Sequence, residues 1–338
     1  MDEQRAVLRT GLWIVALAVF LRLLGTGALD RLTRLPSDPG TLSLLVYLQT
    51  GRKVRLPTKL PVTPQLPQPT QPAPPETVVP QPTQPAPETN ITAEDMNYVN
   101  LSYGGSYRPE LEPLLLSPLS WDLADGQPRV LILHTHATEC YTPSQGETLS
   151  MTGDYRTEDP AYNMLSVGEY VAKRLAEGGV GVIHDRTLHD SPSYNEAYVN
   201  SRKTVQDYLQ KYPSIQLVLD LHRDASGSGA EQLVTVGTVD GQRSAQLMLV
   251  VGTDESGKNH PNWQENLALA LKLTAVLERE DPGLCRSINL RSQRFNQDLS
   301  AGGLIVEVGA AGNTRQEALL AAGALAEGIL KLAKGTAP

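Results

Sequence analysis

Three short apolar runs, each ending abruptly in histidine or a carboxylate, constrain the fold of this chain more than any other feature. They are VLILHTHATE at residues 130–139, LVLDLHRDA at residues 217–225 and GLIVEVGAAG at residues 303–312. Such runs are typical of strands buried on both faces of a parallel sheet. Because ligands bind where the carboxyl ends of such strands meet, we expect the polar residues to gather at one edge.

The residue types at these strand ends are those of a zinc hydrolase. Neutral imidazoles and a carboxylate bind the ion in such enzymes, and one further carboxylate transfers protons. The three runs together supply histidine, aspartate and glutamate. The sequence therefore predicts Zn²⁺ as a cofactor, held by side chains from different strands.

The two cysteines offer an alternative chemistry. Cys140 lies just after the first run, within HTHATEC, and a catalytic thiol there would make the chain a cysteine peptidase. The sequence shows no clear orienting partner for a thiolate, so we favour the metal. Cys140 and Cys285 lack CxxC spacing, and a disulfide between them stays an open alternative.

Strand patterns alternate with helical patterns from about residue 128 onward. The expected strands cover residues 130–134, 179–185, 215–222, 231–239, 246–253, 287–292 and 303–309. The expected helices cover residues 162–177, 263–278 and 314–334, with one more through 205–209. This alternation predicts an α/β fold with a mostly parallel, twisted sheet and helices on both faces.

An apolar segment near the start predicts a membrane anchor. Thr10–Gly25 is interrupted only by Arg22, and with its flanks it gives about 20 positions, enough for one helix across a bilayer. We expect residues 1–30 to form a cytoplasmic start and a single span of the cell membrane, with the catalytic part outside the cytoplasm. A signal peptide cleaved near GTGALD is the alternative.

A proline-rich stretch separates this segment from the strands and helices. Leu56–Asn90 contains the octet PQPTQPAP twice, at residues 67–74 and 80–87. Such a stretch has too little apolar surface to form a core and favours polyproline II. We therefore expect residues 31–127 to be a juxtamembrane and spacer segment, and residues 128–338 to be the catalytic domain.

The net charge excludes one class of partner. The formal charge is −8 and the sequence pI is about 5.3. Binding to a phosphate backbone needs clustered lysine and arginine, so nucleic acid is not an expected partner.

Several motifs together resemble one known family. HTHATECYTP, DLHRDA, VGTDESGKNHPNWQENLALALKL and LIVEVGAAGNTRQEA occur in the order found in the stage II sporulation protein P family. The resemblance covers roughly residues 128–333, and the chain is more distantly similar to zinc-dependent N-acetylmuramoyl-L-alanine amidases. It implies a peptidoglycan hydrolase that cuts the N-acetylmuramoyl-L-alanine amide, and peptide cross-links as well, during engulfment in sporulation. It also implies stage II sporulation proteins D and M as partners.

Position and resemblance together suggest the metal ligands. They select His136, at the end of the first strand, and His222, at the end of the third. His134 either ligates the metal or holds His136 in place. The amidase relatives use an acid just before the first helix, which here is Glu158 or Asp159, and Glu139 is a rival.

The remaining roles follow in the same way. The resemblance implies that Glu307 is the general base, and a salt bridge to Arg223 or Arg291 is the alternative for this carboxylate. Arg223 or Asn313 is expected to contact the oxyanion or the substrate. A non-catalytic wall-binding or scaffold protein on a degenerate amidase fold is the alternative function. The joint presence of His136, His222 and Glu307 disfavours it.

Overall fold

The computed structural model describes residues 76–78, 90–152, 154–225, 227–228 and 231–336. The expected membrane anchor, and the proline-rich stretch apart from residues 76–78 and 90, lie outside these residues. Within the described part, no helix combines the length and apolarity needed to cross a membrane. The chain divides into two compact units, Met1–Thr70 and Gln71–Pro338, and every described residue belongs to the second.

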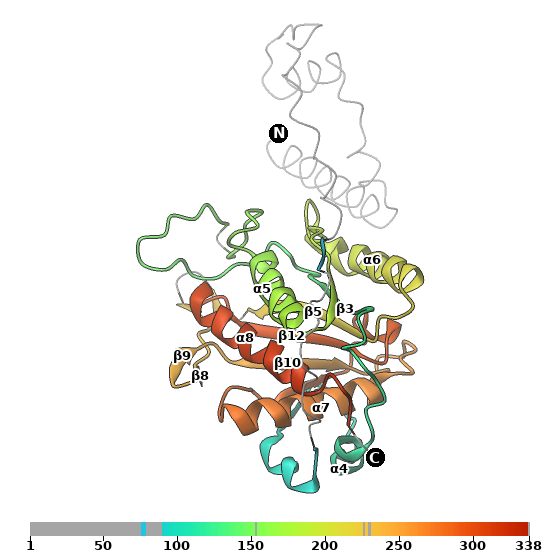
Figure 1. Cartoon of the computed structure of the whole chain (residues 1–338). Coiled ribbons are helices and arrows are strands. Elements are labelled where there is room, and N and C mark those ends of the chain that lie inside the picture. The colour runs from blue at the N-terminus through green and yellow to red at the C-terminus, as the bar shows by residue number, and fades with distance from the viewer. Residues whose placement is uncertain (1–75, 79–89, 153, 226, 229–230, 337–338) are drawn as a thin grey trace, which may run out of the picture. The chain divides into compact units, whose positions relative to one another are not determined.

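An eight-stranded sheet organises this unit (Figure 1). Five of the seven neighbouring strand pairs are parallel, and the pairs β1–β4 and β10–β12 are antiparallel. The expectation of a mostly parallel sheet is therefore confirmed. In spatial order the strands are β1 (Glu76–Val78), β4 (Gly181–His184), β3 (Pro128–Leu133), β5 (Leu217–Asp224), β12 (Gly303–Ala310), β10 (Leu247–Gly252), β11 (Ile288–Arg291) and β2 (Leu101–Tyr103).

Helices cover both faces of the sheet, as the sequence predicted. The side chains of β3 alternate between the two sides. Val130 and Ile132 join the larger core cluster with three helices, whereas Leu131 and Leu133 join a smaller cluster with Val205 of α6. The larger cluster contains α5 (Met164–Glu177), α7 (Trp263–Glu280) and α8 (Arg315–Lys331), and the smaller one contains α6 (Ala197–Lys211).

Local sequence signals fix the ends of two of these helices. The Asn163 side chain accepts a hydrogen bond from the backbone N–H of Leu165 at the start of α5. Thr314 and Glu317 form a reciprocal capping box at the start of α8. These caps satisfy backbone donors that have no partner within a helix.

We expected the folded unit to begin at residue 128, but it begins well before that residue. The segment before β3 forms η1 (Ala93–Tyr98), β2 and α4 (Leu111–Leu116). Strand β2 extends the main sheet by pairing with β11, and Leu115 of α4 is fully buried. Each of these elements has six residues or fewer, too short to give a periodic apolar pattern.

The single strand that we expected over residues 231–239 is not formed. The structure has two short strands there, β7 (Glu231–Gln232) and β8 (Gly237–Val239), and neither joins the main sheet. β7 pairs with β6 (Gly227–Ser228), and β8 pairs with β9 (Gln242–Ser244). Val234 and Val236 between β7 and β8 are exposed, so this apolar run does not contribute a core strand.

Candidate active site

The predicted site residues come together at the carboxyl edge of β3, β5 and β12. Glu307 of β12 and His222 of β5 are register partners on adjacent parallel strands. His136 follows the end of β3, and its ring centroid lies 5.4 Å from that of His222. Both histidines are buried, whereas Glu307 is half-buried. The three strand ends thus deliver two imidazoles and a carboxylate to one place.

Glu139 is the carboxylate beside these histidines. It is buried, and its Oε2 lies 3.7 Å from Nδ1 of His222. The backbone N–H of Arg223 donates to the same oxygen over 3.3 Å. Of the three acids that the sequence left open, the structure brings this one to the site.

Glu158 and Asp159 lie elsewhere, which corrects the expected position of the carboxylate. Both are exposed. Glu158 accepts a hydrogen bond from the Ser191 hydroxyl, and Asp159 accepts one from the backbone N–H of Ala161. Neither bond is made to His136 or His222, whereas Glu139 lies beside His222.

Each site histidine also faces an outer carboxylate that sequence reasoning missed. Nδ1 of His136 lies 3.9 Å from Oδ2 of the buried Asp190. Nε2 of His222 lies 2.9 Å from Oδ1 of Asp220, which Thr135 holds through its N–H and its hydroxyl. Metal-binding histidines commonly direct their second nitrogen to a carboxylate in this way. Asp220 could have been found, because i and i+2 residues share one face of a strand.

Three polar atoms of the site are shielded from water without a hydrogen-bond partner. They are Nδ1 of His136, Nε2 of His222 and Oε2 of Glu307. The proximity of His222 to Asp220 lacks hydrogen-bonding geometry, although the two form an ion pair. Leaving such atoms unpaired costs about 1–3 kcal/mol each. The two ring nitrogens are those that face Asp190 and Asp220, so an ion would bind through the other nitrogen of each imidazole.

Burial and neighbouring charges strongly shift the pKa values of the site residues. Burial raises the pKa of Glu307 to about 8, with Glu139 adding to the effect and His222 opposing it. Burial lowers the pKa of His136 to about 3. Although burial opposes it, the Asp220 carboxylate raises the pKa of His222. Perturbed groups clustered in this manner are typical of functional sites.

The donor types fit a divalent ion, although the side chains do not converge on one. Imidazole nitrogens and a carboxylate are the ligands that zinc prefers. In the part of the chain that the structure describes, no three His, Cys, Asp or Glu side chains form a ready metal-binding group. The residues present that would hold an ion are His136, Glu139 and His222, since Glu139 and His136 each lie beside His222.

His134 serves a different purpose from His136. It is fully buried, its Nδ1 lies 2.9 Å from the carbonyl oxygen of Leu221, and its Nε2 lies 3.0 Å from Nε2 of His184. With both ring nitrogens engaged, it ties β3 to β5 on one side and to β4 on the other. The structure therefore favours a supporting role, since Leu221 immediately precedes His222.

Arg223 and Asn313 do not reach toward a substrate, contrary to our expectation. The Arg223 side chain donates to the backbone carbonyls of Cys140, Asp154 and Tyr155. Asn313 is fully buried, and both ends of its amide are hydrogen-bonded, chiefly to Thr235. Arg223 holds the loop after β3 in place, and Asn313 joins the end of β12 to the start of α8.

The cysteines do not support thiol chemistry. Both Cys140 and Cys285 are free thiols. Burial raises the pKa of Cys140 to about 11 and that of Cys285 well above its usual value. Because the thiolate is the reactive form, neither residue is poised to act as a nucleophile.

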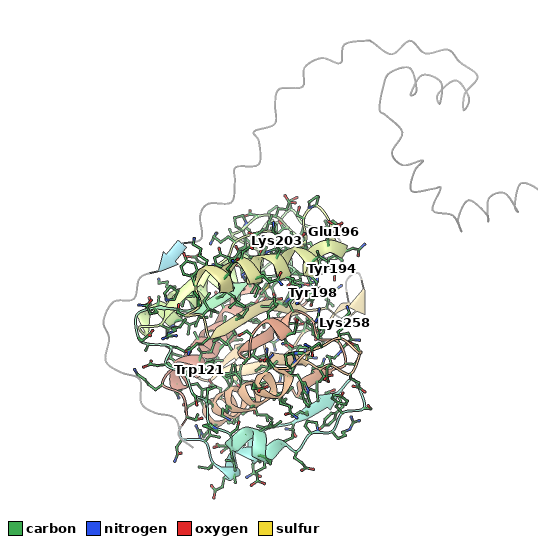
Figure 2. The ribbon with its side chains drawn as sticks, turned by 90° about the vertical axis from the view of Figure 1, so that its right-hand side faces the viewer. Trp121, Tyr194, Glu196, Tyr198, Lys203 and Lys258 are labelled. Carbon is green, nitrogen blue, oxygen red and sulfur yellow. The ribbon has the colours of Figure 1, made fainter. Side chains whose placement is uncertain are left out.

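Arg156 and two tyrosines border the site and were missed by sequence reasoning. The Tyr194 ring stacks on the His136 imidazole with centroids 4.4 Å apart, and Tyr198 meets it edge-on at 5.6 Å. The Arg156 guanidinium lies over the Tyr194 ring and donates to Asp190 over 2.9 Å. Tyr194 lies in the short helix η2 and Tyr198 at the start of α6 (Figure 2), and Arg156 lies outside the helices and strands, so periodic patterns give no signal for them.

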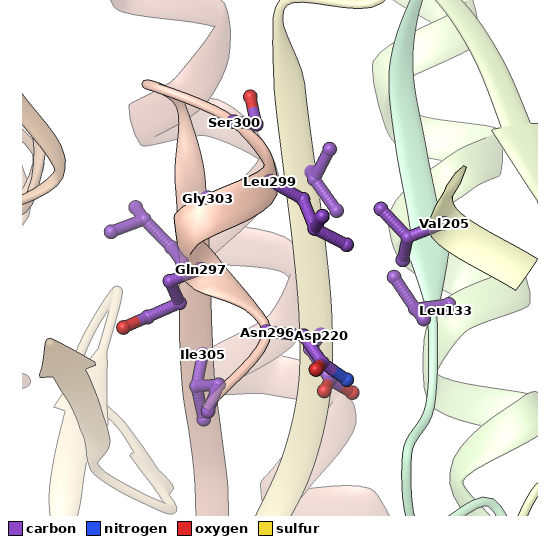
Figure 3. Close-up of a pocket in the computed structure, with 11 residues that line it drawn as sticks. Leu133, Val205, Asp220, Asn296, Gln297, Leu299, Ser300, Gly303 and Ile305 are labelled. Carbon is purple, nitrogen blue, oxygen red and sulfur yellow. The ribbon is translucent and has the colours of Figure 1, made fainter. Parts of the chain in front are cut away.

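A small cavity lies beneath Asp220, on the side of the sheet facing α6 (Figure 3). Its volume is about 20 Å³, which is room for about one water molecule. Apart from Asp220, the strands and α6 line it with apolar side chains: Leu133, Val205, Val218, Leu304 and Ile305.

A relative of known sequence and several solved structures align with this chain. Stage II sporulation protein P of Bacillus subtilis (strain 168) is 30% identical over 210 residues, which are 59% of this chain and 49% of that protein. The chain thus spans about half the length of that relative. A solved N-acetylmuramoyl-L-alanine amidase of Clostridium difficile 630 is 11% identical, with a TM-score of 0.38 over 61% of this chain and 96% of the other. The amidase AmiC2 of Nostoc punctiforme is 15% identical, with a TM-score of 0.35 over 60% and 96%.

The family model supplies the decisive comparison. The model of stage II sporulation protein P matches residues 68–330. That range includes β2 and α4 as well as all the strands that carry the site. The chain belongs to the stage II sporulation protein P family, as its motifs predicted.

Proposed function

We propose that this protein is a zinc-dependent peptidoglycan hydrolase that cleaves the N-acetylmuramoyl-L-alanine amide, and peptide cross-links as well, during engulfment in sporulation. One observation carries the proposal. In a chain of this family, His136, His222, Glu139 and Glu307 gather at one sheet edge, and each imidazole turns one ring nitrogen toward an outer carboxylate, which leaves the other nitrogen for an ion.

In this proposal His136, Glu139 and His222 hold the ion. Bound zinc would polarise the scissile carbonyl and acidify a water molecule. Asp190 and Asp220 orient the two imidazoles through their second nitrogens. The Asp220–His222 pair keeps a proton on His222 in the metal-free protein, so binding of the ion must release that proton.

Glu307 moves the proton in this proposal. It is the register partner of His222, so its carboxylate lies beside the ligands rather than among them. It takes a proton from the attacking water and delivers it to the leaving amine nitrogen. Burial raises its pKa, whereas positive charge at the neighbouring ligands favours the carboxylate form that a base needs.

We further propose the cellular setting that the sequence predicts. The protein is a single-pass membrane protein whose proline-rich stretch separates an extracytoplasmic catalytic domain from the bilayer. Stage II sporulation proteins D and M are its proposed partners. Replacing residues 56–90 by a scrambled sequence of equal length and proline content should preserve function in cells. Shortening the stretch should impair it.

The central experiment combines metal analysis with product analysis. We expect the purified chain, prepared without a histidine tag, to contain one zinc per molecule. It should release new L-alanine amino termini from peptidoglycan and lose that activity to a chelator. His222→Ala should lose zinc, whereas Asp159→Asn, which changes an exposed acid, should retain zinc and activity. A metal-free wild-type protein that binds peptidoglycan without cutting it would instead establish a scaffold.

A further inference from the structure

Tyr194 is the most exposed aromatic residue in the part of the chain that the structure describes. Its exposed fraction is 53%, whereas the other exposed tyrosines lie at 39% or below. It belongs to η2 (Tyr194–Glu196), between the loop that carries Asp190 and the start of α6 (Figure 2). An exposed aromatic ring beside a candidate active site requires an explanation, because leaving it in water forfeits hydrophobic free energy.

Two contacts hold the ring in a fixed orientation. It stacks on the His136 imidazole at 4.4 Å with only 13° between the planes. The guanidinium carbon of Arg156 lies 4.4 Å from the ring centroid. Arg156 is itself fixed, since it donates to Asp190 over 2.9 Å and pairs with Asp154 over 3.2 Å. More than half of the tyrosine stays exposed in spite of both contacts.

A fixed and exposed aromatic ring suits one class of ligand. The C–H groups on one face of a sugar ring are apolar and weakly positive, and the face of an aromatic ring is apolar and negative. Stacking between the two removes apolar surface from water while the sugar hydroxyls stay hydrated. His136 occupies one face of the ring, so a sugar would stack on the opposite face, and only the short lactyl group separates the muramoyl ring from the amide to be cut.

We propose that Tyr194 is a substrate-positioning residue that takes the muramoyl sugar of a glycan strand. This inference rests on the proposed function, and it adds a subsite to that reaction. The stacked sugar presents its lactyl amide to the edge where His136, His222 and Glu307 lie. Arg156 contributes by holding the tyrosine rather than by touching the reacting atoms.

A role limited to packing His136 makes different predictions. If the tyrosine only supported this histidine, removing it would weaken metal binding and alter hydrolysis of every substrate. If it binds sugar, its removal would weaken binding of glycan and leave metal binding unchanged. Zinc affinity and glycan affinity therefore separate the two roles.

The test compares Tyr194→Ala and Tyr194→Phe in the full chain, with Tyr103→Ala as a matched control. Tyr103 is an exposed tyrosine on β2 with a similar cation–π contact, at 4.2 Å from Arg108. The probes are peptide-free glycan strands for binding and muramoyl-peptide fragments for hydrolysis. We expect Tyr194→Ala to raise both the Kd and the KM about tenfold, with kcat and zinc affinity unchanged. Tyr194→Phe and Tyr103→Ala should resemble the wild type.

Two outcomes would decide against the subsite. Glycan affinity unaffected by Tyr194→Ala is the first. A loss of activity in Tyr194→Ala that follows a matching loss of zinc affinity is the second. Failure of the proposed reaction looks different: the wild type would bind glycan strands in a Tyr194-dependent way and yet release no L-alanine termini. That result would keep the subsite and reject the amidase activity.

Discussion

The two ends of the central strands bury charge in different ways. At the carboxyl ends, His136, His222 and Glu307 each keep a shielded polar atom without a partner. Toward the amino ends, Lys272 of α7 lines a hollow with Gln216 and Gly302, which precede β5 and β12. Lys272 is only 1% exposed, and its ammonium donates to the backbone carbonyls of Leu114 and Leu115 and to the Ser117 hydroxyl.

This contrast distinguishes Lys272, which has a structural role, from the groups at the carboxyl ends of the strands, which are available to a ligand. The three acceptors around Lys272 match the three donors of an ammonium group, so nothing is left for another molecule. This lysine fixes the end of α4, whose last carbonyls have no partner within the helix. The opposite end holds several ionisable groups whose bonding stays incomplete. Variants at the carboxyl end should therefore change activity, and variants elsewhere should change stability.

Glu307→Gln should produce the largest effect. The amide has nearly the same size but cannot accept a proton at neutral pH, so hydrolysis of purified peptidoglycan should fall by about 10²–10⁴. Thermal stability should be unchanged or higher, because a buried carboxylate with a raised pKa is replaced by a neutral group. Activity within a few-fold of the wild type, in a protein that keeps its zinc, would remove Glu307 from the role of base.

The strand ends of the site could be predicted from the sequence because their signal is local. A buried strand that stops at a polar residue is visible in a run of a few letters, and together with the family resemblance this located His136, His222 and Glu307. The carboxylate could not be assigned in this way. Glu139 reaches His222 because Arg223 holds the loop after β3, both by pairing with Glu139 and by donating to backbone carbonyls far along the chain. Because every residue has a backbone carbonyl, carbonyl partners cannot be recognised from the sequence.

Other parts escaped prediction for related reasons. Asp190 and Tyr194 lie in a loop that meets the site through tertiary packing. The short elements β2 and α4 have no period long enough to detect, yet they complete the sheet edge and the core. The sequence thus predicts the strand ends at the centre of the site, while the surrounding loops depend on the complete fold.

Gly168→Ala should be the most destabilising of the substitutions considered away from the site edge. A Cβ at this position of α5 would lie 2.4 Å from Nε2 of His134 and 2.5 Å from Nε2 of His184. The two buried imidazoles have no room to move, so we expect a loss of about 2–3 kcal/mol in the free energy of unfolding. Chemical denaturation would measure it.

A second helical glycine provides the control for this substitution. At Gly323 of α8 the nearest atom to an added Cβ belongs to Tyr170, at an ordinary 3.4 Å. Gly323→Ala should therefore stabilise the protein by up to about 1 kcal/mol, because alanine favours helix. If both variants lose stability equally, the added Cβ at residue 168 does not clash with the His134–His184 pair as we describe.

Asp190→Asn tests whether the outer carboxylates serve the metal. The variant retains the size of the side chain and weakens its hold on Nδ1 of His136, so zinc affinity should fall about 10–100-fold. Asp159→Asn, at an exposed acid, should leave the affinity unchanged. Competition with a metal-binding dye would measure both. Equal affinities for the two variants would show that Asp190 supports only Arg156 and Thr138.

Lys272→Met should have the smallest effect and a distinctive pH dependence. Burial lowers the pKa of Lys272 to about 8 from 10.5, so the folded protein binds fewer protons than the unfolded chain between these pH values. The wild type should therefore become more stable as the pH rises from about 8 to 10.5, by about 1–2 kcal/mol from this group. Below pH 8 the full cost of the buried charge is present.

The difference between wild type and Lys272→Met isolates this lysine from the other titratable groups, which both proteins share. Methionine carries no charge, so the stability of the variant relative to the wild type should decline across that window, as measured by denaturation at several pH values. The substitution also removes the ammonium donor from the Leu115 carbonyl, which adds a loss that does not vary with pH. A difference that stays constant from pH 7 to 10.5 would show that the lysine is satisfied in its charged form. The contrast between the two ends of the sheet would then rest on hydrogen bonding alone.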